Sequence, residues 1–145
     1  MQPIVVAAVA FTRAGSVLTV RKRGTSMFML PGGKLEPGES PGQAARREVA
    51  EEVGIEVSDL ELLGEFTAQA ANEPDRTVAS TVFRAVLDGE PAATGEIAEL
   101  RWSSIEATDA DLAPLLRDHV LPALRAPAAG PAAGAGLEWP AEAGG

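Results

Sequence analysis

Apolar and polar positions along the chain predict strands and helices in alternation. Residues 4–11 form one apolar run that ends at a Thr-Arg-Ala-Gly turn, which is typical of a buried strand. In residues 16–21 polar and apolar side chains alternate well enough to predict a second strand that pairs with the first as a hairpin. A short apolar piece at residues 27–30 is stopped by Pro31 and the glycines after it, and a loop is expected at residues 34–39. Further strands are predicted at residues 60–63 (continuing toward Ala71), 77–87 and 100–103.

Residues 40–53 carry the clearest helix signals in the chain. Ser40 is a good N-cap, Pro41 suits the first helical position, and Gln43 completes a capping box with the serine. Gly54 supplies the signal for the end of the helix. A second helix is predicted over residues 111–124, where leucine and valine recur at helical spacing and Pro122 is expected to distort the end.

The last twenty residues differ in composition from the rest of the chain. Alanine, glycine and proline fill 16 of the 20 positions in residues 126–145. Few of these side chains can add to a core, so this segment is predicted to be a flexible Ala/Gly/Pro-rich tail. Leu137 and Trp139 are exceptions that suit docking on the body or on another subunit. Residues 1–125 are expected to form one domain, as a length of 145 residues suggests.

Composition narrows the chemistry that this domain can carry. The 12 basic and 21 acidic residues give a net charge of −9, so counterion release does not favour nucleic-acid binding, and none is expected. An anionic substrate would need a metal ion or a local basic patch. The chain has no cysteine and one histidine, which excludes thiolate chemistry and disfavours zinc. The first apolar run is too short to cross a membrane, and no targeting segment precedes it, so we expect a cytoplasmic protein without membrane partners.

Three acidic residues lie on one face of the predicted helix, where folding does not require them. At about 100° per residue, Glu48, Glu51 and Glu52 share one sector beside an apolar stripe. Like charges at this spacing cost roughly 0.2–0.5 kcal/mol per pair, and the last helical turn disfavours negative charge. One interpretation is a solvated acidic face. The other is a site for a hard divalent cation, Mg²⁺ with Mn²⁺ as a substitute, and the adjacent glycine-rich loop with Lys34 favours a metal-bound diphosphate.

The same segment resembles a known family. Residues 33–55 fill every fixed position of a 23-residue pattern that resembles the Nudix box. Chance agreement at seven fixed identities is rarer than about one chain in a million. Flanking residues are also family-like, and the chain is identified as similar to the Nudix hydrolases, in particular the MutT-like group, over about residues 3–125. The matching residues are Gly33, Glu39, Arg47-Glu48-Val49, Glu51-Glu52 and Gly54-Ile55, with Leu30-Pro31-Gly32-Gly33 before them and Glu96, Glu99 and Trp102 after them.

The resemblance implies both a fold and a reaction. The fold is of the α/β class, an α/β/α sandwich around a mixed β-sheet, with the box as a loop-helix-loop. The reaction is Mg²⁺-dependent hydrolysis of a nucleoside diphosphate linked to another moiety, with water attacking a phosphorus. Dimers are common in such families, and these residues do not decide between a monomer and a homodimer.

The resemblance also assigns roles residue by residue. Glu48, Glu51 and Glu52 are expected to hold Mg²⁺, and Glu48 or Glu52 also orients or deprotonates the attacking water. Arg47 positions these glutamates by ion pairing, and Glu39 supports the loop. Further metal ligands are expected from the carbonyl of Gly32 or Gly33 and from an acid outside the box, for which Glu96 and Glu99 are candidates and Glu73 a weaker one.

Residues outside the box are candidates for substrate contacts. The basic residues nearest the loop are predicted to contact phosphates, with plain solvation as the alternative. Phe28 and its methionine neighbours suit a base pocket, although short apolar runs are commonly core. Trp102 is expected to pack in a strand and His119 to lie on a helix surface. The basic candidates are Arg21, Lys22, Arg23 and Lys34.

Markers of some branches of the family are missing. The chain has no tyrosine or cysteine, no NADH-diphosphatase signature, and at Pro74 a poor match to the ADP-ribose branch. A MutT-like nucleoside triphosphate pyrophosphohydrolase is therefore expected. An ADP-ribose or other sugar-nucleotide pyrophosphatase is the alternative. A non-catalytic nucleotide-binding regulatory module is a third reading, which the intact carboxylates disfavour.

Overall fold

The computed structural model describes residues 2–73 and 75–126 as one mixed sheet with helices on both sides. The strands are β1 (Ile4–Arg13), β2 (Ser16–Lys22), β3 (Phe28–Met29), β4 (Gly32–Lys34), β5 (Glu61–Gln69), β6 (Thr77–Ala85) and β7 (Ile97–Ser104). The helices are α1 (Pro41–Val53), the π-helical turn η1 (Leu116–Val120) and α2 (Leu121–Arg125).

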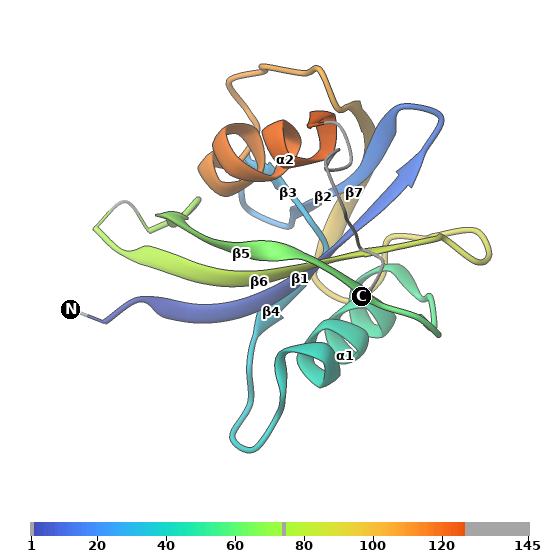
Figure 1. The fold of residues 1–145 in the computed structure, drawn as a ribbon, viewed down its shortest axis with the longest axis horizontal. Helices are drawn as coiled ribbons and strands as arrows, with labels where there is room; N and C mark the ends of the chain where they lie inside the picture. Colours follow the sequence, from blue (N-terminus) through green and yellow to red (C-terminus); the bar gives the residue numbers. More distant parts are fainter. Residues whose placement is uncertain (1, 74, 127–145) are drawn as a thin grey trace.

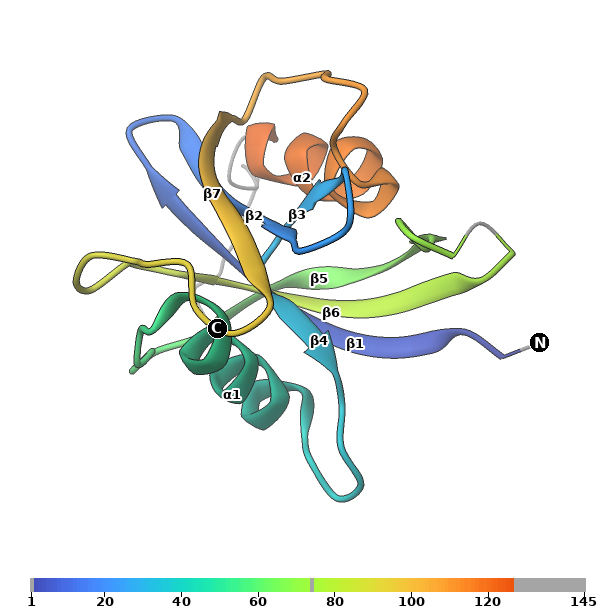
Figure 2. The same cartoon turned by 180° about the vertical axis from the view of Figure 1, so that it is seen from behind.

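Strand β1 connects the two parts of the sheet. It runs parallel to β6 from Ile4 to Phe11, and its middle residues also pair with β4 in antiparallel orientation. Only its last residues, Thr12 and Arg13, form the predicted hairpin with β2. Strand β5 pairs with the far side of β6, while β2 pairs with both β3 and β7. The sheet therefore bends along β1, as Figures 1 and 2 show.

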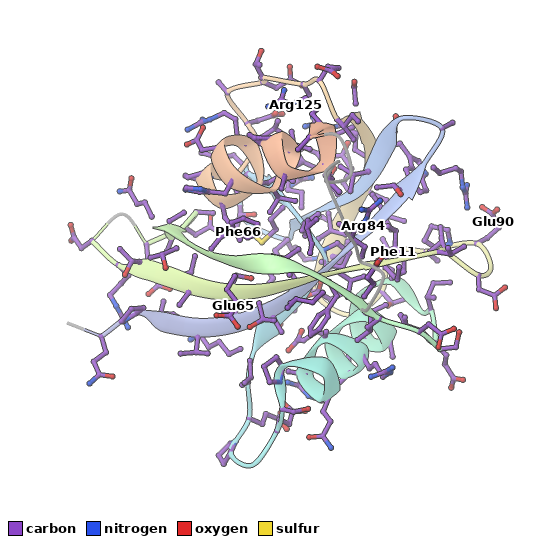
Figure 3. All side chains as sticks on the ribbon, viewed as in Figure 1. Phe11, Glu65, Phe66, Arg84, Glu90 and Arg125 are labelled. Atoms are coloured by element: carbon purple, nitrogen blue, oxygen red, sulfur yellow. The ribbon has the colours of Figure 1, made fainter. Side chains whose placement is uncertain are left out.

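Alternate residues of β1 enter two separate cores. Ala7, Val9 and Phe11 pack with the apolar face of α1, whereas Ala8 and Ala10 pack with η1 and α2 on the opposite face. Since both faces of β1 are covered, its sequence is an unbroken apolar run rather than an alternating one. This arrangement confirms the predicted α/β/α sandwich (Figure 3).

Helix α1 forms as its capping signals predict. The Ser40 side chain accepts a hydrogen bond from the Gln43 backbone N–H, and the Gln43 side chain accepts one from Ser40. Gly54 ends the helix in the left-handed conformation, at a φ of 71°. These local interactions fix both ends of the segment that carries the acidic residues.

Two segments differ from the sequence predictions. Gly32–Lys34 is strand β4 rather than a stop followed by a loop, because it pairs with Val6, Ala7 and Ala8 of β1. The second helical segment begins at residue 114 instead of 111, since Leu112 bridges to Phe28 and the Phe28 N–H donates to the Asp111 carbonyl at 2.7 Å. Pairing with a distant strand decides both cases.

A proline explains the irregular turn in this second segment. The Leu121 N–H donates to the Leu116 carbonyl, five residues back, which widens the turn in η1. Pro122 follows directly and has no N–H to donate to the carbonyl four residues before it. The expected distortion is therefore a π-helical turn, after which α2 continues to Arg125.

Other boundaries lie close to their predictions. Strand β7 starts at Ile97 rather than at residue 100, and β5 and β6 end two residues short of the predicted bounds. No helix in the described residues is long and apolar enough to span a membrane. Leu137, Trp139 and all but the first residue of the predicted tail lie outside the described residues.

Candidate functional site: a two-ended cleft beside helix α1

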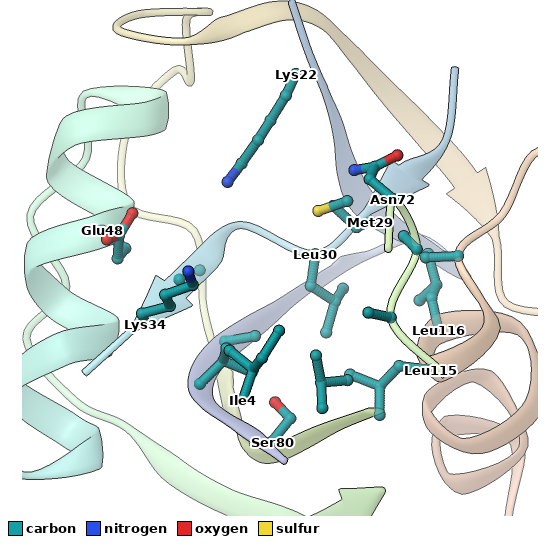
Figure 4. A pocket seen from close by; sticks show the side chains of 18 of the residues that line it. Ile4, Lys22, Met29, Leu30, Lys34, Glu48, Asn72, Ser80, Leu115 and Leu116 are labelled. Carbon is teal, nitrogen blue, oxygen red and sulfur yellow. The ribbon is translucent and has the colours of Figure 1, made fainter. Parts of the chain in front are cut away.

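A cleft of about 380 Å³ lies between α1, the first halves of β1 and β6, and the start of the second helical segment. One end is polar and is bordered by α1 and β4, and the other end is apolar (Figure 4). A ligand that carries a charged group and an apolar ring therefore matches the two ends. The polar end is lined by Lys22, Lys34, Glu48, Glu51 and Glu96, and the apolar end by Ile4, Met29, Leu30, Val78, Leu115 and Leu116.

Arg47 ties the loop before α1 to the helix. Its guanidinium donates to both carboxylate oxygens of Glu39, at 2.7 and 2.9 Å, and to the Lys34 carbonyl at 3.0 Å. It also donates to Glu48 at 2.8 Å and lies 3.6 Å from Glu51. The bond from Arg47, with help from the Glu36 N–H, lowers the pKa of the Glu39 carboxyl to about 2. Glu39 therefore stays ionised and holds the loop against the helix at neutral pH.

Glu48 lies directly against the backbone of β4. A Cβ atom added to Gly33 would stand 2.5 Å from the Glu48 carboxyl carbon and 2.6 and 2.8 Å from its oxygens. A Cβ added to Gly32 would overlap the Ala7 carbonyl oxygen and Ala8 of the neighbouring strand. A side chain is therefore excluded at the two positions for different reasons. At residue 32 it would prevent the pairing of β4 with β1, and at residue 33 it would displace the Glu48 carboxylate.

Glu52 is the buried member of the acidic group. It is only 5% exposed, and its carboxylate accepts a hydrogen bond from the Gly32 N–H at 3.2 Å. Burial raises the pKa of Glu52 to about 8, against the effects of the Gly32 N–H and the Lys22 charge, and the Glu48 carboxylate raises it further. A buried acid beside a second acid is the electrostatic setting that a bound cation relieves.

A NUDIX domain model matches residues 1–124. The chain belongs to the NUDIX family. Its similarity to individual members is moderate, and the shared sequence shows family membership more clearly than it shows any one substrate.

Three relatives illustrate this range. A MutT NUDIX hydrolase from Burkholderia pseudomallei has a crystal structure that superposes with a TM-score of 0.70 at 26% identity, covering 81% of this chain and 95% of that one. A Bacillus subtilis protein to which an 8-oxo-dGTP diphosphatase activity is attributed is 28% identical over 97 residues, 66% of this chain and 62% of its own length. The RNA pyrophosphohydrolase of Proteus mirabilis is 45% identical over 51 residues, 35% of this chain and 29% of its own length.

The three box glutamates of this NUDIX chain do not all converge. Within residues 2–73 and 75–126, no three acidic or histidine side chains surround a common point in the structure. Glu48 and Glu52 lie together, whereas the Glu51 side chain is 59% exposed and faces Arg47. A hard cation fits the close pair, because both residues supply carboxylate oxygens. The third carboxylate would have to rotate inward to join it.

The acids outside the box separate into two groups. Glu96 and Glu73 line the cleft, so either can approach its contents. Glu99 is paired with Arg21 at 3.1 Å and does not line the cleft, which leaves it without a position from which to complete a metal site there.

The basic candidates separate in the same way. Lys22 and Lys34 line the cleft, and the Lys22 side chain extends toward Glu48 in Figure 4. Arg21 is turned to Glu99 and Thr25, and Arg23 donates to the Gly95 carbonyl at 3.1 Å. Neither arginine lines the cleft, so the phosphate contacts predicted for them are not available in this arrangement.

Phe28 is a core residue, contrary to the predicted substrate contact. It is 4% exposed, and the Arg101 guanidinium stacks over its ring at 3.7 Å. Because successive residues of a strand face opposite sides, its neighbour Met29 lines the cleft instead. Trp102 packs against the core under Arg13, and half-buried His119 stacks on Phe66.

Sequence reasoning missed three polar residues of the cleft, Gln69, Asn72 and Ser80. Asn72, in the loop after β5, lies beside Met29, and Ser80 lies in the middle of β6 (Figure 4). A serine between valines at positions 78 and 82 was a usable signal, since it interrupts an inward-facing apolar row. Its position on the cleft depends on how β6 pairs with β1, which the sequence does not reveal.

Proposed function

We propose that this protein is a Mg²⁺-dependent pyrophosphohydrolase that cleaves a phosphoanhydride bond of a nucleoside triphosphate or a closely related nucleotide. The observation that carries the proposal is the Glu48–Glu52 pair: Glu48 lines the polar end of a cleft whose other end is apolar, and Glu52 is buried beside Glu48. The pair suits a metal-bound diphosphate, and the apolar end suits a base.

The metal site that we propose is built on this pair. Glu48 and Glu52 would hold Mg²⁺, with Glu51 joining after rotation, and a backbone carbonyl of Gly32 or Gly33 is available on the facing strand. When bound, the ion neutralises the diphosphate and lowers the pKa of a coordinated water. Glu96 or Glu73, which also line the cleft, would complete the site.

The remaining residues position the reactants. Arg47 donates to Glu48 at 2.8 Å and, through Glu39, fixes the loop that follows Lys34. Lys22 and Lys34 supply the positive charge that a phosphate chain needs in a protein of net charge −9. Glu48 or Glu52 would accept the proton of the attacking water.

Nucleoside triphosphates are the preferred substrates because the cleft is small and mostly apolar away from α1. The similarity to the 8-oxo-dGTP diphosphatase supports this choice, and the similarity to an RNA pyrophosphohydrolase adds a 5′-triphosphorylated RNA as a second candidate. The net charge of −9 disfavours that polyanion. Sugar nucleotides such as ADP-ribose stay as the alternative for the same chemistry.

A substrate panel tests the proposal. Purified protein is incubated with Mg²⁺ and nucleoside triphosphates, ADP-ribose, UDP-sugars or 5′-triphosphorylated RNA, and phosphate and pyrophosphate are detected separately. We expect a nucleoside monophosphate and pyrophosphate from at least one triphosphate. The absence of hydrolysis across the whole panel would refute the proposal.

Two variants tie the activity to the site. Glu52→Gln keeps the side-chain shape and removes the charge, so we expect kcat to fall by about 10²–10⁴ while the fold persists. Glu65→Gln is the matched control, because Glu65 is exposed on β5 (Figure 3) and does not line the cleft. If Glu52→Gln turned over as fast as Glu65→Gln, the catalytic site would lie elsewhere.

A further inference from the structure

The apolar end of the cleft contains a polar side chain that nothing else in the structure explains. Ser80 is 2% exposed, and its Oγ has no hydrogen-bond partner in the described part of the chain. Hydroxyl groups in protein interiors are almost always hydrogen-bonded, because a buried unpaired one destabilises the fold. An unpaired hydroxyl beside a cleft therefore indicates a partner that arrives with a ligand.

Packing alone favours an apolar residue at this position. Val78, Ser80 and Val82 share one face of β6, and the serine is the polar member of that row. Their partners on β1, Ile4, Val6 and Ala8, are all apolar. A valine at residue 80 would continue the row without burying an unpaired hydroxyl, so the serine is not explained by the core.

Ser80 also stands at the place where the helical layer leaves the sheet open. The second helical segment starts only at residue 114. Its residues Leu115 and Leu116 line the same cleft as Ile4 of β1 and Val78 of β6. In Figure 4 the Ser80 oxygen points from β6 toward the side of the sheet on which Ile4, Leu30 and Leu115 lie. Leu30 and Met29 line the same apolar end, and Glu48 lines the polar end.

We propose that the Ser80 hydroxyl hydrogen-bonds to a polar edge atom of the substrate's heterocyclic base and thereby selects among bases. This inference rests on the proposed nucleotide substrate and assigns the apolar end to its base. A base is a flat, largely apolar ring with a few polar edge atoms, which matches an apolar wall that holds a single hydroxyl. Ser80 is thus a specificity-determining residue, remote from the reacting phosphates.

Binding of non-hydrolysable nucleotides tests this assignment independently of turnover. The affinities of the α,β-methylene analogues of the adenosine, guanosine, cytidine and uridine triphosphates are measured by calorimetry with Mg²⁺, for the wild type and Ser80→Ala. We expect the wild type to prefer one base about fivefold or more. In Ser80→Ala, the loss of one hydrogen bond should weaken the binding of that analogue about three- to tenfold and leave the affinities of the others almost unchanged.

The thermal midpoint provides a second readout with a matched control. Because the Ser80 hydroxyl is unpaired without ligand, Ser80→Ala should not lower Tm. Ser103 is also buried, but its hydroxyl lies 3.1 Å from the Thr19 hydroxyl and 3.3 Å from Arg101, on β7 and outside the cleft lining. Ser103→Ala should therefore lower Tm and keep the base preference of the wild type.

Specific outcomes would overturn the assignment. These are a base preference that survives Ser80→Ala, a fall in Tm like that of Ser103→Ala without a change in preference, or a wild type that binds all four analogues equally or none. The hydrolysis panel decides the proposed function separately. An inactive protein that still shows Ser80-dependent base preference would refute the pyrophosphohydrolase but keep the base site.

Discussion

Replacement of Gly33 by alanine should strongly reduce activity while leaving the fold intact. The φ of Gly33 is not in the left-handed region, so alanine meets no backbone strain. The added methyl group instead meets the Glu48 carboxylate, which is the far end of a flexible side chain. Glu48 can move aside, and the change in the free energy of unfolding should stay below about 1 kcal/mol.

The expected loss of activity follows from the distance that Glu48 must travel. The added Cβ would stand 2.5 Å from the Glu48 carboxyl carbon, and ordinary contact begins at 3.4 Å, so the carboxylate must retreat by 3.4 − 2.5 = 0.9 Å or rotate away. A misplacement of about 1 Å in a catalytic group can reduce the rate about 10²-fold. That factor corresponds to about 2.7 kcal/mol of transition-state stabilisation.

Urea unfolding and steady-state kinetics on the best substrate of the panel measure the two effects. Gly32→Ala is the structural counterpart, because its methyl group meets backbone of β1, and it should destabilise the protein by about 1–3 kcal/mol or more. Gly42→Ala is the neutral control, since its nearest contact would be the end of the Arg46 side chain at 3.6 Å. Near-normal kcat/KM in Gly33→Ala would refute the placement of Glu48 in the site.

Two further predictions concern charge. The pKa of Glu52 is about 8 in the folded protein against an ordinary 4.5, so only the unfolded state is ionised between these values. Without metal, stability should therefore fall as pH rises from about 4.5 to 8, by up to about 1.4 kcal/mol per pH unit. Mg²⁺ binds the ionised form, so it should raise Tm more at pH 8.5 than at pH 6; melting curves with equal shifts at both pH values would contradict this. Arg47→Lys loses the two-pronged bond to Glu39, and kcat/KM should fall about tenfold with little change in Tm, whereas unchanged kinetics would remove the positioning role of Arg47.

Local signals explain why α1 was predictable. The capping box of Ser40 and Gln43 and the stop at Gly54 act between residues that are neighbours in sequence, so no other part of the chain is needed to place the ends. The acids on this helix oppose its folding preferences, which is why they were visible as candidates for chemistry. Arg47 and Glu39, eight residues apart, meet because the same short loop-helix segment contains both.

The positions of the other site residues depend on contacts between distant segments. The sequence alone determined the acidic helix, the glycine-rich segment before it and the family to which they belong. Only the tertiary structure decided that Gly32–Lys34 pairs as β4, that Met29 rather than Phe28 faces the cleft, and that Ser80, paired with Val6, lines the same cleft. Strand register sets each of these, and a shift by one residue would turn every side chain to the opposite face. That register is fixed when the sheet packs against the helices on both of its faces, and no short stretch of the sequence contains this information.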